Sequence, residues 1–187
     1  MLPVKSISPE RLIRISNYDT GEPYFGYSGA NRFDAPGCAS GTPEFAACYF
    51  GLSLPVAIAE TVLHDEEAVS CHYYLPPSDL SSRRVLNFAG AKLRCANLTG
   101  EHLKKLGGHA DLAGTVDYAV TQQWSLAVFN NPGNFDGFVY MSRHLNTGMA
   151  VILFDRAAPK IRLATVSSLL GTTGFAAAAR MFGIIGI

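Results

Sequence analysis

Residues 48–64, CYFGLSLPVAIAETVLH, decide how the chain is organised. An apolar run that ends at Phe50 predicts a strand. After a short break, Ser53 is a helix cap and Pro55 suits the first turn of a helix, which the pattern extends to about His64. The stretch therefore predicts a strand followed almost at once by an apolar helix.

Glu60 is the one carboxylate in that helix, and its sequence neighbours are almost all apolar. A charged group is costly to bury unless it is paired or used in chemistry. Glu60 is thus either a structural partner of a buried cation such as Arg14 or a functional residue, and the pattern alone leaves both open.

Composition limits the classes of protein. The chain has 187 residues, enough for one domain, with 48% hydrophobic and 16% charged residues and a formal net charge of zero. This composition disfavours a disordered chain and direct nucleic-acid or membrane binding driven by bulk charge. Zero net charge on so apolar a chain predicts a partner or a homodimer.

Cysteine and histidine usage gives no metal or nucleophile motif. The four cysteines predict free thiols in a reducing compartment, and the N-terminal sequence lacks a signal-peptide pattern, so a cytoplasmic location is expected. His64 and His72 stand near Cys71 at no zinc-site spacing, so no metal site is expected. A Cys48–His144 nucleophile is not favoured, because such pairs arise by chance.

Periodicity predicts an α+β domain. Helices are predicted at 53–64, 99–106 and 116–129, and strands at 11–15, 45–50, 84–88, 93–98, 138–141, 149–154 and 161–166, with short extended pieces at 31–33 and 69–74. Helices do not alternate regularly with strands, which favours a mixed or antiparallel sheet. In the helix at 116–129, the stripe of Val116, Val120, Trp124 and Val128 predicts the face that packs on the core.

The domain boundaries follow from the same pattern. We expect a single domain over 1–187, with a core at about 11–156 and an apolar C-terminal segment, 157–187, docked on the core or at an interface. Its last part, 169–187, is about long enough to span a bilayer, but four glycines and a central Arg180 argue against a membrane span.

Polar residues at strand ends and in loops supply the other site candidates. Tyr49 ends the strand before the Glu60 helix, Ser142 follows the strand 138–141, and Arg32 lies between two loops rich in glycine and proline. Taken singly, Arg32 suits a surface ion pair, Tyr49 a core aromatic and Ser142 a turn cap. No nucleophile elbow, phosphate loop or dinucleotide-binding glycine motif is present.

Together these pieces resemble the RES-domain family. The resemblance runs from RLIRIS at 11–16 through NRF at 31–33, CYFGLSLPVAIAET at 48–61 and TQQWSLAVF at 121–129 to NFDGFVYMSRH at 134–144. It implies an ADP-ribosyltransferase-like fold and a toxin that consumes NAD and is neutralised by an Xre-type helix-turn-helix antitoxin. By match of motif, Glu60 and Arg32 would be catalytic, and Arg32, Tyr49 and Ser142 would bind NAD as substrate.

The residue types suit that chemistry. Nicotinamide leaves NAD as a neutral molecule, so one carboxylate beside the oxocarbenium-like ribose is sufficient. The acceptor of ADP-ribose stays open between water or phosphate and a protein or nucleic acid, the last being mono-ADP-ribosyltransfer. A non-enzymatic module acting through its apolar surface is the alternative from a different class.

Overall fold

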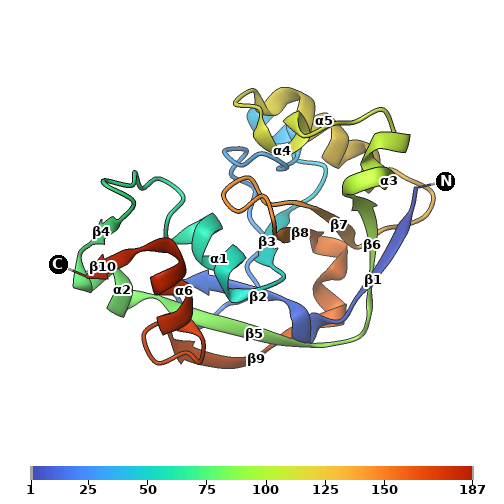
Figure 1. Ribbon diagram of the computed structural model, residues 1–187. Coiled ribbons are helices and arrows are strands. Elements are labelled where there is room, and N and C mark those ends of the chain that lie inside the picture. Colours follow the sequence, from blue (N-terminus) through green and yellow to red (C-terminus); the bar gives the residue numbers. More distant parts are fainter. Residues whose placement is uncertain (1, 187) are drawn as a thin grey trace.

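The computed structural model describes residues 2–186, and its centre is a mixed eight-stranded sheet (Figure 1). In spatial order the strands are β1 (Val4–Ile7), β6 (Leu93–Leu98), β7 (Gly137–Met141), β8 (Met149–Phe154), β3 (Ala47–Gly51), β2 (Ile13–Ser16), β5 (Arg84–Gly90) and β9 (Ile161–Ser168). β6 and β7 run parallel, and every other neighbouring pair is antiparallel. The predicted α+β class with a mixed sheet is confirmed.

Two groups of helices pack on different parts of this sheet. α1 (Leu54–Thr61) packs on β2 and β3, and α6 (Phe175–Phe182) packs on α1. α3 (Gly100–Lys105), α4 (Asp111–Gly114) and α5 (Tyr118–Phe129) form the crossover that a parallel β6–β7 pair requires. The remaining helical elements are α2 (Pro77–Ser82) and the 3₁₀ turns η1 (Pro9–Arg11), η2 (Pro36–Ser40) and η3 (Asp155–Lys160).

Side-chain alternation along β3 divides the core. Cys48 and Phe50 pack in one apolar cluster, whereas Tyr49 packs on the opposite side with Phe33 and Phe138. Successive side chains of a strand point to opposite faces. Burial raises the pKa of the Cys48 thiol to about 12, so Cys48 is a core thiol turned away from Tyr49.

The sheet opens between β2 and β3, which share the residue pair Ile13–Gly51 before they diverge. At that point α1 approaches β3 closely: a Cβ on Gly51 would lie 2.7 Å from the backbone nitrogen of Ala57. Only glycine fits there without a shift of the helix. Gly51 therefore lets α1 pack against the strand end beside the opening.

Two sequence predictions are wrong in whole or in part. Residues 31–33 form a turn instead of an extended piece. In α5 the predicted stripe is only half right: Trp124 and Val128 pack on the core, but Val116, before the helix, is 83% exposed and Val120 is 58% exposed. The buried face carries Thr121, Ser125 and Val128, because two of these residues hydrogen-bond to loop carbonyls, a contact that apolar periodicity does not register.

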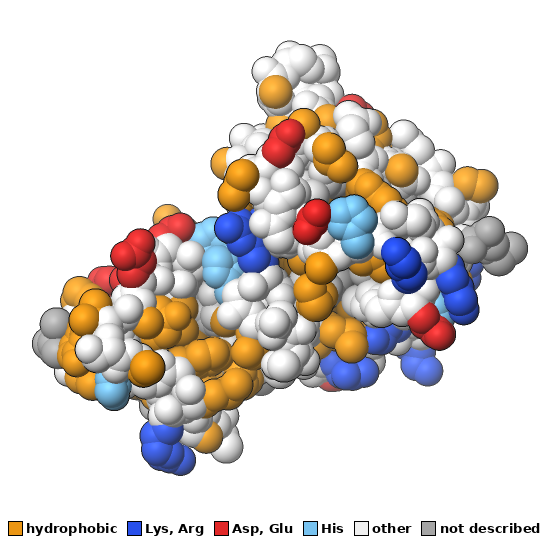
Figure 2. Space-filling view, turned by 45° about the horizontal axis from the view of Figure 1, so that its top comes forward, with side chains coloured by type: hydrophobic (Ala, Val, Ile, Leu, Met, Phe, Trp, Pro, Cys, Tyr) orange, Lys and Arg blue, Asp and Glu red, His pale blue; other side chains and the backbone are white. Residues whose placement is uncertain are grey.

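The sheet also reaches outside the expected core of residues 11–156, because β1 and β9 both belong to it. The last described residues follow β9 as α6 and β10 (Ile184–Gly186), which pairs in parallel with β4 (Tyr73–Leu75). Leu170, Met181 and Ile185 in this segment are exposed, and Figure 2 shows hydrophobic side chains gathered at this end of the molecule. Within residues 2–186 no helix combines the length and apolar character of a membrane span.

Candidate active site

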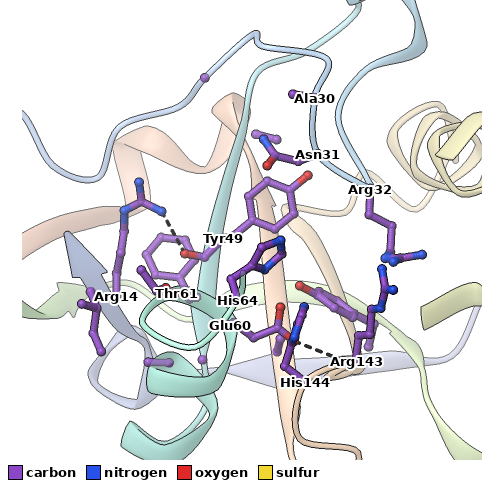
Figure 3. Close-up of a pocket in the computed structure, with 18 of the residues that line it drawn as sticks. Arg14, Ala30, Asn31, Arg32, Tyr49, Glu60, Thr61, His64, Arg143 and His144 are labelled. Carbon is purple, nitrogen blue, oxygen red and sulfur yellow. Dashed lines mark hydrogen bonds between the residues drawn. The ribbon is translucent and has the colours of Figure 1, made fainter. Parts of the chain in front are cut away.

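A pocket of about 710 Å³ lies where β2 and β3 diverge. Its walls come from those two strands, from α1, from the loop at residues 24–32 and from the start of the β7–β8 link. Arg32, Tyr49 and Glu60 all line it (Figure 3). The fold therefore places three of the four candidate residues on the pocket wall, including Arg32 from a distant loop.

Glu60 is held in the last turn of α1 by contacts to the β7–β8 link. Its Oε1 accepts a hydrogen bond of 2.5 Å from the Ser142 hydroxyl and one of 3.1 Å from the Arg143 backbone N–H. Within residues 2–186, Oε2 has no hydrogen-bond partner from the protein. One carboxylate oxygen is thus fixed, and the other is free for a ligand.

Ser142 lies behind Glu60 and is fully buried, outside the pocket wall. Its hydroxyl oxygen accepts a hydrogen bond of 3.0 Å from the Leu145 backbone N–H and donates its proton to Glu60. This geometry makes Ser142 a support for Glu60 rather than a lining residue.

Arg32 comes from a turn whose backbone is anchored by α5. Thr121 donates a hydrogen bond from its hydroxyl to the Arg32 carbonyl, and Ser125 donates one of 2.8 Å to the Phe33 carbonyl. The Arg32 side chain donates to the Thr115 carbonyl and lies 4.8 Å from the centre of the Tyr118 ring. The residue is 9% exposed, and this burial lowers the pKa of Arg32.

Tyr49 presents its ring to the pocket while its hydroxyl is engaged. The hydroxyl donates a hydrogen bond of 2.8 Å to Asp34 and accepts one of 3.2 Å from the Phe33 backbone N–H. Burial, with the nearby Asp34 charge, raises the pKa of Tyr49 well above its usual value. The neutral ring is therefore the part that can contact a ligand.

Asp34 organises the Arg32 turn, and sequence reasoning missed it. It is 2% exposed and also accepts hydrogen bonds from the Ser28 hydroxyl and the Asn31 backbone N–H. Its place two residues after Arg32, in a polar turn, is the signal that could have found it.

Arg14, the cation named above as a structural partner for Glu60, pairs with another carboxylate. It pairs with Glu22 at 2.9 Å, and its guanidinium also donates to the Tyr49 carbonyl at 3.3 Å. This second bond satisfies a strand carbonyl at the place where β2 and β3 diverge.

Three further pocket residues were not among the candidates. Arg143 follows Ser142 directly, and Figure 3 shows its side chain on the same side as Arg32. His64 lies in the turn after α1, four residues beyond Glu60, and its ring centre lies 4.5 Å from that of His144. Burial lowers the pKa of His144, against the opposing effect of the Glu60 charge. The i, i+4 spacing of Glu60 and His64 is the signal that could have paired them.

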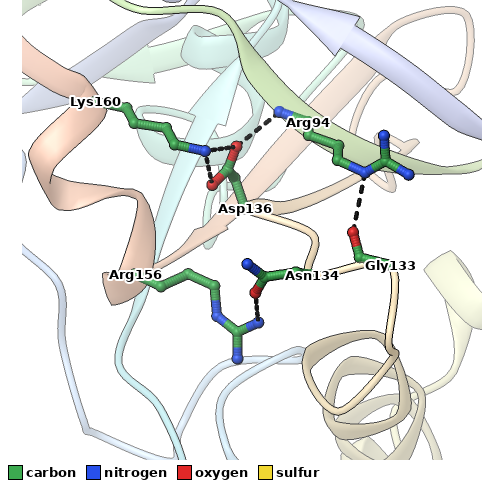
Figure 4. Close-up of polar contacts among 6 residues, drawn as sticks. All are labelled: Arg94, Gly133, Asn134, Asp136, Arg156 and Lys160. Carbon is green, nitrogen blue, oxygen red and sulfur yellow. Dashed lines mark hydrogen bonds and ion pairs between the residues drawn. The ribbon is translucent and has the colours of Figure 1, made fainter.

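Asp136, a buried carboxylate, shows what a structural acid looks like in this fold. Asp136 lies outside the pocket and accepts hydrogen bonds on both oxygens from Lys160, at 2.8 and 2.9 Å, with another from the Arg94 backbone N–H (Figure 4). Every side of Asp136 is thus occupied by the protein. Glu60 differs because one of its oxygens is left to the pocket.

Comparison with known proteins gives one family and one fold. A family model described as "RES domain" matches residues 9–173, and no curated protein matches the chain. Among solved structures, a chain of the M. tuberculosis MbcT–MbcA toxin–antitoxin complex superposes with a TM-score of 0.63 at 14% sequence identity. The match covers 97% of the present chain and 91% of that one, so the two share a fold.

Proposed function

The chain belongs to the RES domain family, and we propose that it is an enzyme that cleaves NAD at the nicotinamide–ribose bond. The observation that carries this proposal is the pocket in which Glu60 leaves one carboxylate oxygen free opposite the cation of Arg32. The pocket volume of about 710 Å³ lies within the range of small-molecule and cofactor sites.

Glu60 would stabilise the developing charge on the ribose. As nicotinamide leaves, the anomeric carbon becomes oxocarbenium-like and positive. A carboxylate oxygen held beside it in a partly dehydrated pocket attracts that charge more strongly than it would in water. Because Ser142 and the Arg143 N–H hold the other oxygen, the carboxylate need not reorganise during the reaction.

The cations and the aromatic ring would bind the rest of NAD. Arg32 and Arg143 line the same pocket, and a guanidinium binds phosphate oxygens with two parallel hydrogen bonds. The Tyr49 ring offers a flat surface to nicotinamide or ribose. Ser142 would act on the substrate through Glu60, as a positioning residue.

The direct test is release of nicotinamide from NAD by the purified chain. We expect turnover by the wild type and a fall of about 10³-fold in Glu60→Ala, the scale of losing one preorganised electrostatic group. Glu101→Ala, which removes an exposed carboxylate on α3, is the matched control and should retain activity. Absence of turnover by the wild type, or equal turnover by Glu60→Ala, would sink the proposal.

The acceptor is a separate question that the same reaction answers. Free ADP-ribose as product indicates water, its 1″-phosphate indicates inorganic phosphate, and radiolabel retained on a macromolecule indicates mono-ADP-ribosyltransfer. We propose a small acceptor, water or phosphate, because the pocket that holds Glu60 is a concave site within the domain. Label on protein or nucleic acid in stoichiometric yield would replace this with the transferase alternative.

We also propose that the chain acts in the cytoplasm as the toxin of a toxin–antitoxin pair, with a helix-turn-helix antitoxin as partner. The family assignment and the fold shared with a chain of a toxin–antitoxin complex support this. Expression in bacteria should arrest growth and deplete NAD, and Glu60→Ala should relieve both. Relief by deletion of residues 169–187 but not by Glu60→Ala would instead favour the non-enzymatic module.

A further inference from the structure

We propose that Glu60, His64 and His144 form a binding site for a zinc-like divalent cation on the pocket wall, and that a metal bound there inhibits the enzyme by engaging Glu60. The site is inferred from geometry alone. Its inhibitory effect rests on the function proposed above, so the two parts are tested separately.

The three side chains converge from the last turn of α1, from the turn that follows it and from the β7–β8 link. One ligand atom from each lies within 4.8 Å of the others, and Figure 3 shows the three together beside Arg143. Zinc bonds of about 2.0–2.1 Å in a tetrahedron hold ligand atoms about 3.4 Å apart. The His64 side chain is half-exposed, so it has room to rotate and bring its ring nitrogen to the shorter distance that zinc requires.

The donor set selects the kind of metal. Two imidazoles and one carboxylate, with a fourth position open to the pocket, are a ligand set that zinc adopts. Cobalt, nickel and copper bind the same set, whereas magnesium and calcium prefer all-oxygen sites. The free Oε2 of Glu60 can coordinate while Oε1 keeps its bonds to Ser142 and Arg143.

The charges around the site should make metal binding there reversible. The Glu60 carboxylate attracts a cation, and an Asp65 oxygen lies 3.8 Å from Nε2 of His64. The guanidinium groups of Arg32 and Arg143 line the same pocket and oppose the binding of a further cation there. We therefore expect an exchangeable metal that competes with substrate, not a permanent structural ion.

The first experiment measures metal binding without NAD. Cys71, an exposed free thiol, is replaced by serine in every protein. Zinc chloride titrated calorimetrically into the metal-free full chain should bind one to one, and His64→Ala and His144→Ala should each weaken binding by at least about tenfold. His109→Ala, an exposed histidine outside this pocket, should bind as the parent does. Equal affinity in all four proteins, or no binding, overturns the site.

Cobalt gives an independent readout of the ligands. Co²⁺ in the proposed site should show intense visible d–d absorption of a tetrahedral complex, lost in His64→Ala and His144→Ala. A strong thiolate-to-cobalt charge-transfer band would place the metal on cysteine instead and overturn the assignment.

The second experiment measures inhibition of NAD cleavage. Zinc should inhibit the parent protein, a chelator should restore activity, and magnesium should have no effect. The concentration for half-inhibition, taken relative to each variant's own rate without metal, should rise at least about tenfold in His64→Ala and His144→Ala. Zinc that binds without inhibiting would overturn the inhibitory role. Failure of every protein to cleave NAD would instead count against the proposed function, while calorimetry still decides the site.

Discussion

Glu60 and Arg32 face one pocket, but the protein holds them in two different ways. Glu60 projects from a helix that follows β3 directly, and a serine at the end of β7 fixes its inner oxygen. Arg32 projects from a turn with no regular structure. Its backbone is held by hydroxyl groups of α5, almost ninety residues further along the chain.

The two sides differ in the kind of interaction that positions the backbone of the functional residue. On the Glu60 side, apolar packing of α1 positions the backbone: Ala57, Ile58 and Ala59 are buried beside Glu60. On the Arg32 side, hydrogen bonds position the backbone. Asp34 accepts hydrogen bonds from Tyr49, Ser28 and Asn31. We therefore expect substitutions on the first side to change kcat, and those on the second to change the KM for NAD.

The largest effect should come from moving the Glu60 charge without removing it. Glu60→Asp keeps the carboxylate but shortens the side chain by one methylene, so α1 holds it too far from the ribose and from Ser142. We expect kcat to fall about 10²-fold, the scale of a misplacement near 1 Å, with the KM for NAD little changed. Steady-state kinetics with nicotinamide release measures both. A kcat near that of the wild type would mean that the pocket adapts and that α1 does not set the position.

Arg32→Lys tests the other wall at the level of the side chain. Lysine keeps the positive charge but loses the planar fork and its stacking over Tyr118. We expect kcat/KM to fall about 30-fold, the cost of one hydrogen bond to a charged group, mostly through KM. Arg162→Lys on the exposed β9 strand is the matched control. A fall in kcat alone would assign Arg32 to the chemical step. It would contradict the expectation that substitutions on the Arg32 side change the KM for NAD.

Ser142→Ala asks whether the serine touches substrate or holds Glu60. Because its hydroxyl donates to Oε1 of Glu60 and is fully buried, we expect kcat to fall about tenfold and the KM for NAD to hold. Ser142→Thr, which keeps the hydroxyl, should recover part of the loss. An increase in KM with kcat unchanged would return Ser142 to direct substrate binding.

Sequence alone could predict most of the Glu60 side, because its determinants are local. The Ser53 cap, the apolar helix and the strand before it are neighbours in the chain, and each has a short-range signal. The predicted strand 138–141, which Ser142 follows, also corresponds to β7. No local sequence pattern contains the strand order, which places the end of β7 beside α1.

The Arg32 side was less predictable because its contacts are polar and distant in sequence. The apolar stripe of α5 pointed to Val116 and Val120, both exposed, and hid the hydroxyls of Thr121 and Ser125 that bind the turn. The role of Asp34 depends on the Tyr49 hydroxyl reaching it across fifteen residues. Periodicity measures which face of an element is apolar, and it does not register a polar face that is buried by hydrogen bonding.

Thr121→Val should have the smallest effect on catalysis. It tests whether α5 holds the Arg32 turn in position. The substitution keeps the shape of the side chain and removes the hydroxyl that bonds to the Arg32 carbonyl and to the Tyr118 carbonyl of its own helix. We expect the free energy of unfolding to fall by about 1–3 kcal/mol, because a buried carbonyl loses its partner, and the KM for NAD to rise a few-fold as the turn loosens, with kcat unchanged.

Thr172→Val is the matched control for that variant, since it loses a hydroxyl bond to the Ser168 carbonyl in the turn after β9, outside the pocket. Because its hydrogen bond is exposed, Thr172→Val should lower stability by less than Thr121→Val does, and it should leave the KM for NAD unchanged. If Thr121→Val loses stability and binds NAD as tightly as the control does, α5 supports the fold and not the position of Arg32. The Arg32 turn would then be held by Asp34 and its partners, and Asp34→Asn should raise the KM where Thr121→Val does not.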